Sequence, residues 1–192
     1  LPLEVALNTT FTFYIRVNIE RFPNNHSFGL SNLSGESINA ENYNAFEPML
    51  RITDKTESNG LKNSGALMVI GAHDAKQKVI YHDVINPHTA KTAEPMRENA
   101  WYQIWFVVNN STKQRGGQVY DVYMQGGEFT HISKVFENAH FRMGREKALT
   151  HFITIANTGP FSEPYGNGGL RFDDIYMAEG IKLSSPISQL AN

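Results

Sequence analysis

The chain lacks cysteine, long apolar runs and clusters of basic residues. Without cysteine it has no disulfide, no catalytic thiol and no thiolate metal ligand, although exported and intracellular proteins both remain compatible with that absence. Its apolar runs are too short to cross a bilayer, so we expect no membrane insertion. With 17 basic and 19 acidic side chains and a net charge of −2, the composition argues against a nucleic-acid partner.

The remaining composition is typical of a globular protein. Of the 192 residues, 41% are hydrophobic, which suits one domain over residues 1–192 with a sizeable core. The chain starts at Leu1, without an initiator Met or a positively charged leader. We therefore expect a mature chain or a monomeric domain cut from a larger one.

The most apolar stretch, Trp101–Val108, contains both tryptophans and predicts a strand buried on both faces in the middle of a sheet. The two-residue period of a strand separates it into an apolar side and a mixed side that includes Gln103 and Trp105. An indole beside a carboxamide indicates either packed core or half of a sugar-binding platform, because sugars present C–H faces to rings and hydroxyls to amides.

Other segments repeat the alternation of apolar and polar residues over short lengths. Residues 21–44 are rich in Asn, Ser and Gly and predict loops around one sheet edge, with room for a short strand at Phe28–Leu30. Only Glu137–Leu149 offers a helical turn. About ten short strands without an ordinary amphipathic helix predict an all-β fold, an antiparallel sandwich of two sheets. The further strands are expected at Thr10–Val17, Phe46–Thr53, Ala66–Ile70, Lys78–Ile85, Gln118–Gln125, Phe129–Phe136, Phe152–Ala156 and Leu170–Ala178.

Three motifs in the second half carry a family resemblance: Trp101-Tyr102, the hairpin GQVYDVYMQGGE at 117–128, and Phe172–Tyr176 followed by Leu183-Ser184. With them the chain resembles the concanavalin A-like, or laminin G-like, jelly-roll domains of bacterial polysaccharide-degrading systems. The resemblance implies a jelly roll, a polysaccharide ligand, and a secreted or cell-surface location. It does not select a ligand, because this fold serves lectins, carbohydrate-binding modules, glycanases and lyases.

The Asp173-Asp174 pair is the best metal candidate in the sequence. Neighbouring strand residues point to opposite faces, so one carboxylate with nearby carbonyls would suit Ca²⁺. In related jelly rolls a C-terminal-strand aspartate ties the chain ends through such an ion, and Asp173 matches that position. The alternative is that both acids cap turns or pair with Arg171. Zinc is not expected, because no ligand spacing joins the seven histidines.

Catalytic motifs of the family are missing. Jelly-roll glycanases carry E-x-D-x-x-E on one strand, and jelly-roll alginate lyases carry R-x-E-x-R, Q-x-H and Y-F-K-x-G-x-Y; none occurs in this chain. Arg51, His82 and Tyr123 would supply similar ingredients to a lyase. A lone strand histidine such as His82 is more often structural.

Large polar and aromatic side chains remain on strand faces expected to point away from the core, and on a concave sheet they would line a sugar groove. The sequence therefore predicts a non-catalytic polysaccharide-binding module. The alternatives are a polysaccharide lyase or hydrolase with an unfamiliar motif, and a laminin G-like adhesion or protein-binding module. The expected carbohydrate-binding residues are Arg16, Arg51, His82, Trp105 and Tyr123.

Overall fold

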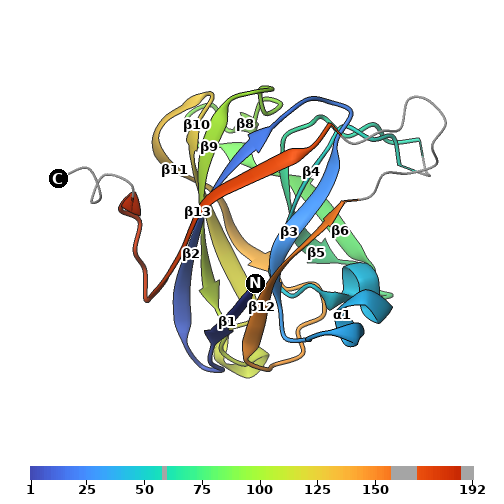
Figure 1. The fold of residues 1–192 in the computed structure, drawn as a ribbon, viewed down its shortest axis with the longest axis vertical. Helices are drawn as coiled ribbons and strands as arrows, with labels where there is room; N and C mark the ends of the chain where they lie inside the picture. The colour runs from blue at the N-terminus through green and yellow to red at the C-terminus, as the bar shows by residue number, and fades with distance from the viewer. Residues whose placement is uncertain (58–59, 157–167, 187–192) are drawn as a thin grey trace.

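The structure, a computed structural model, describes residues 1–57, 60–156 and 168–186. Two antiparallel sheets face each other, which confirms the predicted all-β sandwich (Figure 1). The five-stranded sheet has the order β11 (Phe129–His140), β10 (Val119–Gly126), β9 (Trp101–Asn109), β2 (Thr10–Ile19), β13 (Leu170–Glu179). The six-stranded sheet has the order β1 (Pro2–Val5), β12 (Leu149–Ala156), β3 (Asn25–Ser31), β4 (Met49–Thr53), β5 (Leu67–His73), β6 (Val79–Asp83).

The smaller elements lie in the connections. β7 (Ile85–Asn86) and β8 (Lys91–Thr92) form a two-stranded ribbon. The helical segments are α1 (Glu36–Glu41), η1 (Asn42–Ala45) and η2 (Lys113–Arg115). No helix of the described residues is long and apolar enough to span a bilayer.

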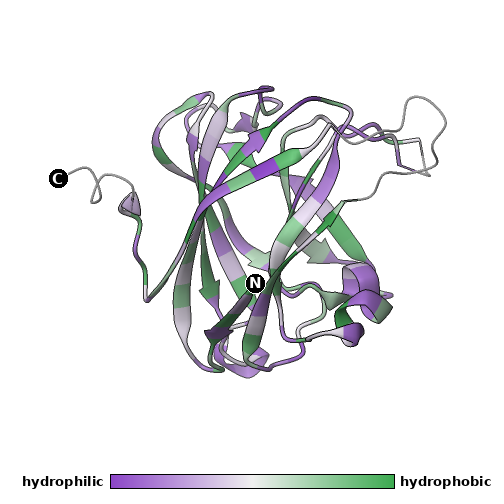
Figure 2. Cartoon of the chain, viewed as in Figure 1, coloured by the Kyte–Doolittle hydropathy of each residue, from purple (hydrophilic) through white to green (hydrophobic). Residues whose placement is uncertain are grey.

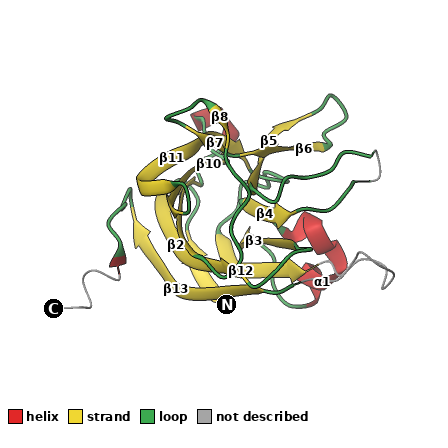
Figure 3. Ribbon diagram, turned by 90° about the horizontal axis from the view of Figure 1, so that it is seen from above, coloured by secondary structure: helices red, strands yellow, loops and turns green. Residues whose placement is uncertain are grey.

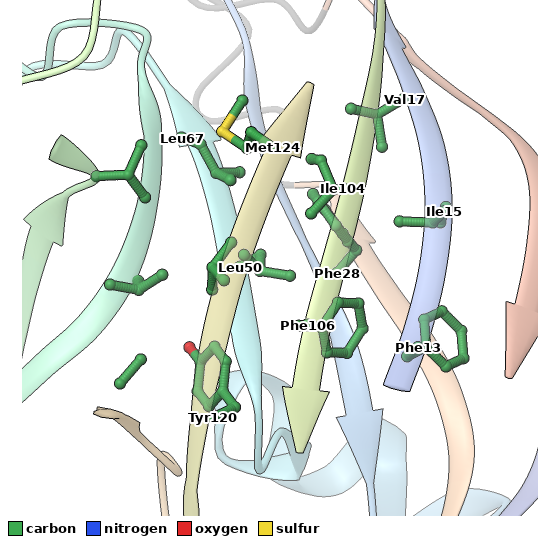
Figure 4. Packing of buried hydrophobic residues seen from close by; sticks show 14 of the residues in the cluster. Phe13, Ile15, Val17, Phe28, Leu50, Leu67, Ile104, Phe106, Tyr120 and Met124 are labelled. Atoms are coloured by element: carbon green, nitrogen blue, oxygen red, sulfur yellow. The ribbon is translucent and has the colours of Figure 1, made fainter. Parts of the chain in front are cut away.

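Alternation along the strands builds the core between the sheets, and Figure 2 shows the resulting bands of apolar and polar residues. Every second residue of β2, β9 and β10 points inward against β3, β4 and β5 (Figure 4). Burying each such side chain contributes about 1.5–3 kcal/mol. The labelled core residues are Phe13, Ile15, Val17, Phe28, Leu50, Leu67, Ile104, Phe106, Tyr120 and Met124.

The prediction for Trp101–Val108 is confirmed. β9 lies between β2 and β10, and its residues from Ile104 to Val108 are buried on both faces. Only its first residue, Trp101, exposes a large part of its side chain, 39%. The five-stranded sheet is therefore organised around the strand that the sequence marks most strongly.

Two expectations about the connections are wrong. Residues 21–44 do not merely loop around an edge, because β3 lies inside the sheet between β12 and β4. The one α-helix of the described residues is α1 in that same region. The proposed helical turn at Glu137–Leu149 is instead the end of β11, a loop and the start of β12. β3 was hard to recognise because polar residues such as Ser27 and Ser31 occupy a face that is nevertheless buried.

A second, smaller apolar cluster covers the outer face of the six-stranded sheet. The segment after β3 folds back through α1 and η1 and places Ala45 and Phe46 on Met49, Ile70 and Ile153. Figure 3 shows α1 on the side of this sheet that faces away from β2 and β13. Consequently β4 is buried on both faces, including the side chain of Arg51.

Candidate functional site

The outer face of the five-stranded sheet carries a row of aromatic side chains at one register. Strand pairing sets Tyr176 opposite Tyr14, Tyr14 opposite Trp105, and Trp105 opposite Tyr123. The ring centroids of Tyr14 lie 5.1 Å from Trp105 and 6.0 Å from Tyr176. These spacings are those of attractive aromatic pairs, so the rings pack together across β13, β2 and β9, and the register extends the row to Tyr123 on β10.

A second row of polar side chains runs beside the aromatic one. Arg16 lies opposite Gln103, and Gln103 opposite Gln125. The Tyr14 hydroxyl donates to Gln103 Oε1 at 3.0 Å, and the Arg16 guanidinium lies 4.6 Å from the Trp101 ring centroid. The alternation in the sequence thus brings three predicted residues, Arg16, Trp105 and Tyr123, onto one face.

The segment 180–186 returns across this face after β13 (Figure 1). The Thr12 hydroxyl donates to Gly180 O, the Lys182 N–H donates to Thr12 Oγ1, and Ser185 Oγ donates to Gln103 Oε1 at 2.9 Å. Burial in this setting raises the pKa of the Tyr14 hydroxyl, so it stays a protonated hydrogen-bond donor over the physiological range.

A cavity of about 300 Å³ lies between this segment and the edge of the sheet. Its walls carry tyrosine rings, hydroxyl groups and one cationic side chain. We call it the aromatic cavity. It is lined by Thr12, Tyr14, Tyr176, Met177, Ala178, Lys182, Ser184 and Pro186.

Trp105 does not offer a ring to a ligand. Its side chain is fully buried, and its indole N–H has no hydrogen-bond partner among the described residues. The expectation of a sugar platform at Trp105 is therefore not met by the geometry. On the same row, Tyr176 exposes 37% of its surface and is the accessible ring.

Arg51 and His82 lie away from that face. Arg51 is 7% exposed on the outer face of the six-stranded sheet, where Asn25 Oδ1 accepts from its Nε and Nη2 and Glu57 pairs with its Nη1 at 2.8 Å. His82, on β6, lies on the other face of the same sheet from Arg51, and its ring centroid is 6.2 Å from that of Phe136 on β11. The five predicted carbohydrate-binding residues are therefore spread over three places, and Arg51, His82 and Tyr123 form no common catalytic site.

The structure accounts for Asp174 without a metal. A bulge interrupts β13 between Asp173 and Tyr176, with Asp174 at φ 50°, and Asp174 pairs with Arg16 at 2.8 Å. Asp173 Oδ1 accepts the Asp174 N–H. Arg171, the partner considered from the sequence, pairs with Glu20 instead. Within residues 1–57, 60–156 and 168–186, no group of three or more His, Asp or Glu is suited to a metal, and calcium stays a prediction.

The sequence analysis missed a second cavity, of about 480 Å³, where β5 and β11 end and β10 begins. His73 and His140 meet there with ring centroids 5.8 Å apart, beside Lys113 and Arg142. His73 and Lys113 are 40 positions apart and Lys113 and His140 are 27 apart, so no short motif joins all four residues, although Arg142 follows His140 by two positions. The only signal in the sequence was the cationic character of the turns that end these strands. We call this second cavity the cationic cavity.

No protein-family profile matches the chain, and no curated protein matches it. Solved structures with a similar course of the chain include the marine PL-14 alginate lyase from Aplysia kurodai, at 12% identity over 92% of this chain and 72% of the lyase, with a TM-score of 0.48. A mutant of alginate lyase Aly36B in complex with alginate tetrasaccharide has 8% identity over 93% and 70%, with a TM-score of 0.42. Alginate lyase vAL-1 from Chlorella virus has 14% identity over 90% and 72%, with a TM-score of 0.38.

Proposed function

We propose that this protein binds a polysaccharide on the outer face of its five-stranded sheet. The observation that carries the proposal is the aromatic row that ends in the aromatic cavity. Tyr176 offers an exposed ring there, and the exposed residues Lys182 and Ser184 line the same space. A sugar needs this combination, because its C–H face stacks on a ring while its hydroxyls bind polar groups.

The size and construction of the cavity agree with a small sugar subsite. About 300 Å³ is at the lower end of the range for ligand pockets, so one part of a longer chain would enter while the rest ran along the open face. Strands also hold Tyr14 and Tyr176 rigidly, which reduces the entropy lost on binding.

The test is affinity electrophoresis through gels that contain neutral and acidic polysaccharides. Tyr176→Ala removes the exposed ring and should weaken binding by about 1–3 kcal/mol, the scale of burying one large side chain. Ile132→Ala is the matched control, because Ile132 is equally exposed at 37% but lies on β11 at the other edge of the sheet. Equal retardation of Tyr176→Ala, Lys182→Ala and the parent by every polysaccharide would remove the aromatic cavity from the binding site.

One observation favours a second candidate function, a polysaccharide lyase. The cationic cavity sets two imidazoles beside two permanent cations. In a lyase step on a uronate, a base removes the proton next to the carboxylate, the bond to the neighbouring glycosidic oxygen breaks, a ring double bond forms, and that oxygen takes a proton. Cations lower the cost of removing that proton, because they stabilise the negative charge that develops beside the carboxylate. Burial lowers the pKa of His140, so its imidazole is neutral and able to accept a proton near pH 7.

Ultraviolet absorbance of the unsaturated product distinguishes the two candidates. A lyase at this site should lose its activity in His140→Gln, while His131→Gln, an exposed histidine elsewhere on β11, should keep it. Retardation in the gel without any new absorbance or new reducing ends would leave binding as the function.

A further inference from the structure

The cationic cavity brings together two cations that form no ion pair among the described residues, whereas most described arginines do form one. Arg16, Arg51 and Arg145 each have a carboxylate partner, as do Arg97, Arg171 and Lys134. Arg142 and Lys113 have none among the described residues, although they lie in one cavity. Two uncompensated cations in a concave site attract an anion more strongly than the same charges on an open surface.

Neutral groups hold the Arg142 side chain in place. Its Nε donates to Asn44 Oδ1 at 3.2 Å, its Nη1 donates to the Tyr81 hydroxyl at 2.9 Å, and its guanidinium lies 5.9 Å from the Tyr43 ring centroid. These contacts orient the planar fork without cancelling its charge. A fixed guanidinium binds a carboxylate or sulfate with little further loss of conformational entropy.

The two histidines line the same space. His73 Nε2 lies 2.9 Å from Arg142 O, and because a carbonyl only accepts, this nitrogen carries the hydrogen. His140 faces His73 edge to face. Burial first, and then the charges of His73 and Lys113, lower the pKa of His140, as expected where positive groups crowd one another.

Lys113 comes close to the backbone of the opposite wall. A Cβ on Gly144 would lie 2.7 Å from Lys113 Nζ, and Gly144 has φ +64°, so glycine at this position leaves the space that the ammonium group occupies. The ammonium group of Lys113 therefore lies against the cavity wall at Gly144, and Arg142 lines the same cavity.

The carboxylates near the cavity are all engaged elsewhere. Buried Glu47 accepts from the amides of Gly144 and Arg145 and pairs with the Arg145 guanidinium at 3.1 Å. Glu146 accepts the Lys113 N–H, and Asp74 accepts the amides of Lys76 and Lys78 in the β5–β6 turn. None of these carboxylates lines the cavity, and the charged residues that do line it, Lys113 and Arg142, are cations.

We propose that the cationic cavity binds the anionic group, carboxylate or sulfate, of an acidic sugar. The presence of an anion site follows from the cavity and its unpaired cations, and only the identification of the anion as part of a sugar rests on the proposed function. About 480 Å³ accommodates more than an inorganic ion. The polysaccharide ligand is thus an acidic one, and the two cavities contact different parts of it.

The test is titration calorimetry with an alginate tetrasaccharide as the acidic probe and a cellulose tetrasaccharide as the neutral one. Lys113→Ala combined with Arg142→Gln should weaken binding of the acidic probe roughly ten- to hundred-fold, the usual effect of losing hydrogen bonds to a charged group. Binding of the neutral probe should not change. Lys91→Ala combined with Arg97→Ala removes the same two charges from exposed positions away from the cavity and is the matched control.

Arg142 also supports Asn44 and Tyr81, so its variant can lose stability. Lys113→Ala alone keeps the test decisive, because the Lys113 side chain is exposed and its loss should still reduce affinity several-fold. Unchanged affinity for the acidic probe in a folded Lys113→Ala variant would overturn the proposal. So would binding of inorganic sulfate that the acidic tetrasaccharide does not displace.

The pattern of results separates this inference from the proposed function. Failure of the aromatic site would appear as no effect of Tyr176→Ala on either probe, while the cation variants still reduced binding of the acidic one. Failure of the cationic site would appear as equal loss of both probes in Tyr176→Ala and no selective loss in Lys113→Ala.

Discussion

The aromatic and cationic cavities border the same five-stranded sheet but are built in different ways. The aromatic cavity takes its rings from alternating positions within β2 and β13 and is closed by the segment 180–186. The cationic cavity takes its groups from the ends of β5 and β11 and from the loops that follow. Strand interiors therefore supply the rigid stacking surface, whereas strand ends supply the charges.

Trp105→Ala should have the largest effect on stability, because the Trp105 side chain is fully buried and packs against Tyr14 of the aromatic row. Removing a buried tryptophan typically costs 3–5 kcal/mol, and we expect that loss of unfolding free energy in a denaturant titration. Trp101→Ala, at the exposed end of the same strand, should cost much less. Similar small losses for both would mean that the row does not depend on Trp105.

Calcium provides the next test, of the β13 edge beside the aromatic cavity. If Asp173 binds one structural Ca²⁺, saturating the ion at about a hundred times its dissociation constant contributes about 2.7 kcal/mol. Chelation should then lower the melting temperature, and Asp173→Asn should abolish the difference. Elemental analysis that finds no calcium, with the same melting temperature after chelation, would contradict the prediction.

Ionic strength should separate the two cavities. The contacts proposed for the cationic cavity are between charges, so raising salt from about 0.1 M to 1 M shortens the Debye length from about 10 Å to 3 Å and should weaken acidic-probe binding several-fold. Stacking on Tyr176 carries no charge, and neutral-probe binding should stay within error. Parallel salt dependence for both probes would argue against separate sites.

The smallest expected effect is on stability in weak acid. Burial lowers the pKa of His26 from its ordinary value of 6.5, so the unfolded state binds the extra proton first as pH falls. The contribution of His26 to the free energy of unfolding is therefore fully present above pH 6.5 and is lost as the pH falls below that value. Melting temperatures at pH 7.5 and about 5.5 should differ less in His26→Gln than in the parent, compared at matched ionic strength. An equal drop in both proteins would assign the acid sensitivity to other groups.

The sequence predicts the strand interiors well, because alternation follows directly from which face is buried. Thr10–Val17, Trp101–Val108 and Gln118–Gln125 all appear as strands, and Arg16, Trp105 and Tyr123 share the face that the period of two assigns to them. Alternation does not, however, say what covers that face. The burial of Trp105 and the return of residues 180–186 are tertiary facts that the strand pattern does not contain.

The remaining misses have the same origin. β3 has a polar outer face that is buried only because the segment containing α1 folds back over the six-stranded sheet. His73 ends β5, whereas Lys113 and Arg142 lie in two connections, so the meeting of the three depends on strand order. Arg51 and His82 were expected together, but they lie on opposite faces of one sheet, which follows from register rather than from composition.

The pairing of β13 with β2 joins the two ends of the described fold, and it has a kinetic consequence. Thr12 and Gly180 are hydrogen-bonded although 168 residues separate them in sequence. Closing so long a loop is entropically costly and brings no reward until the intervening strands are in place, so folding should belong to the slow, millisecond-to-second class of high contact order. Until β13 docks, β2 is an unpaired edge rich in Phe and Tyr, the kind of edge through which partly folded chains associate.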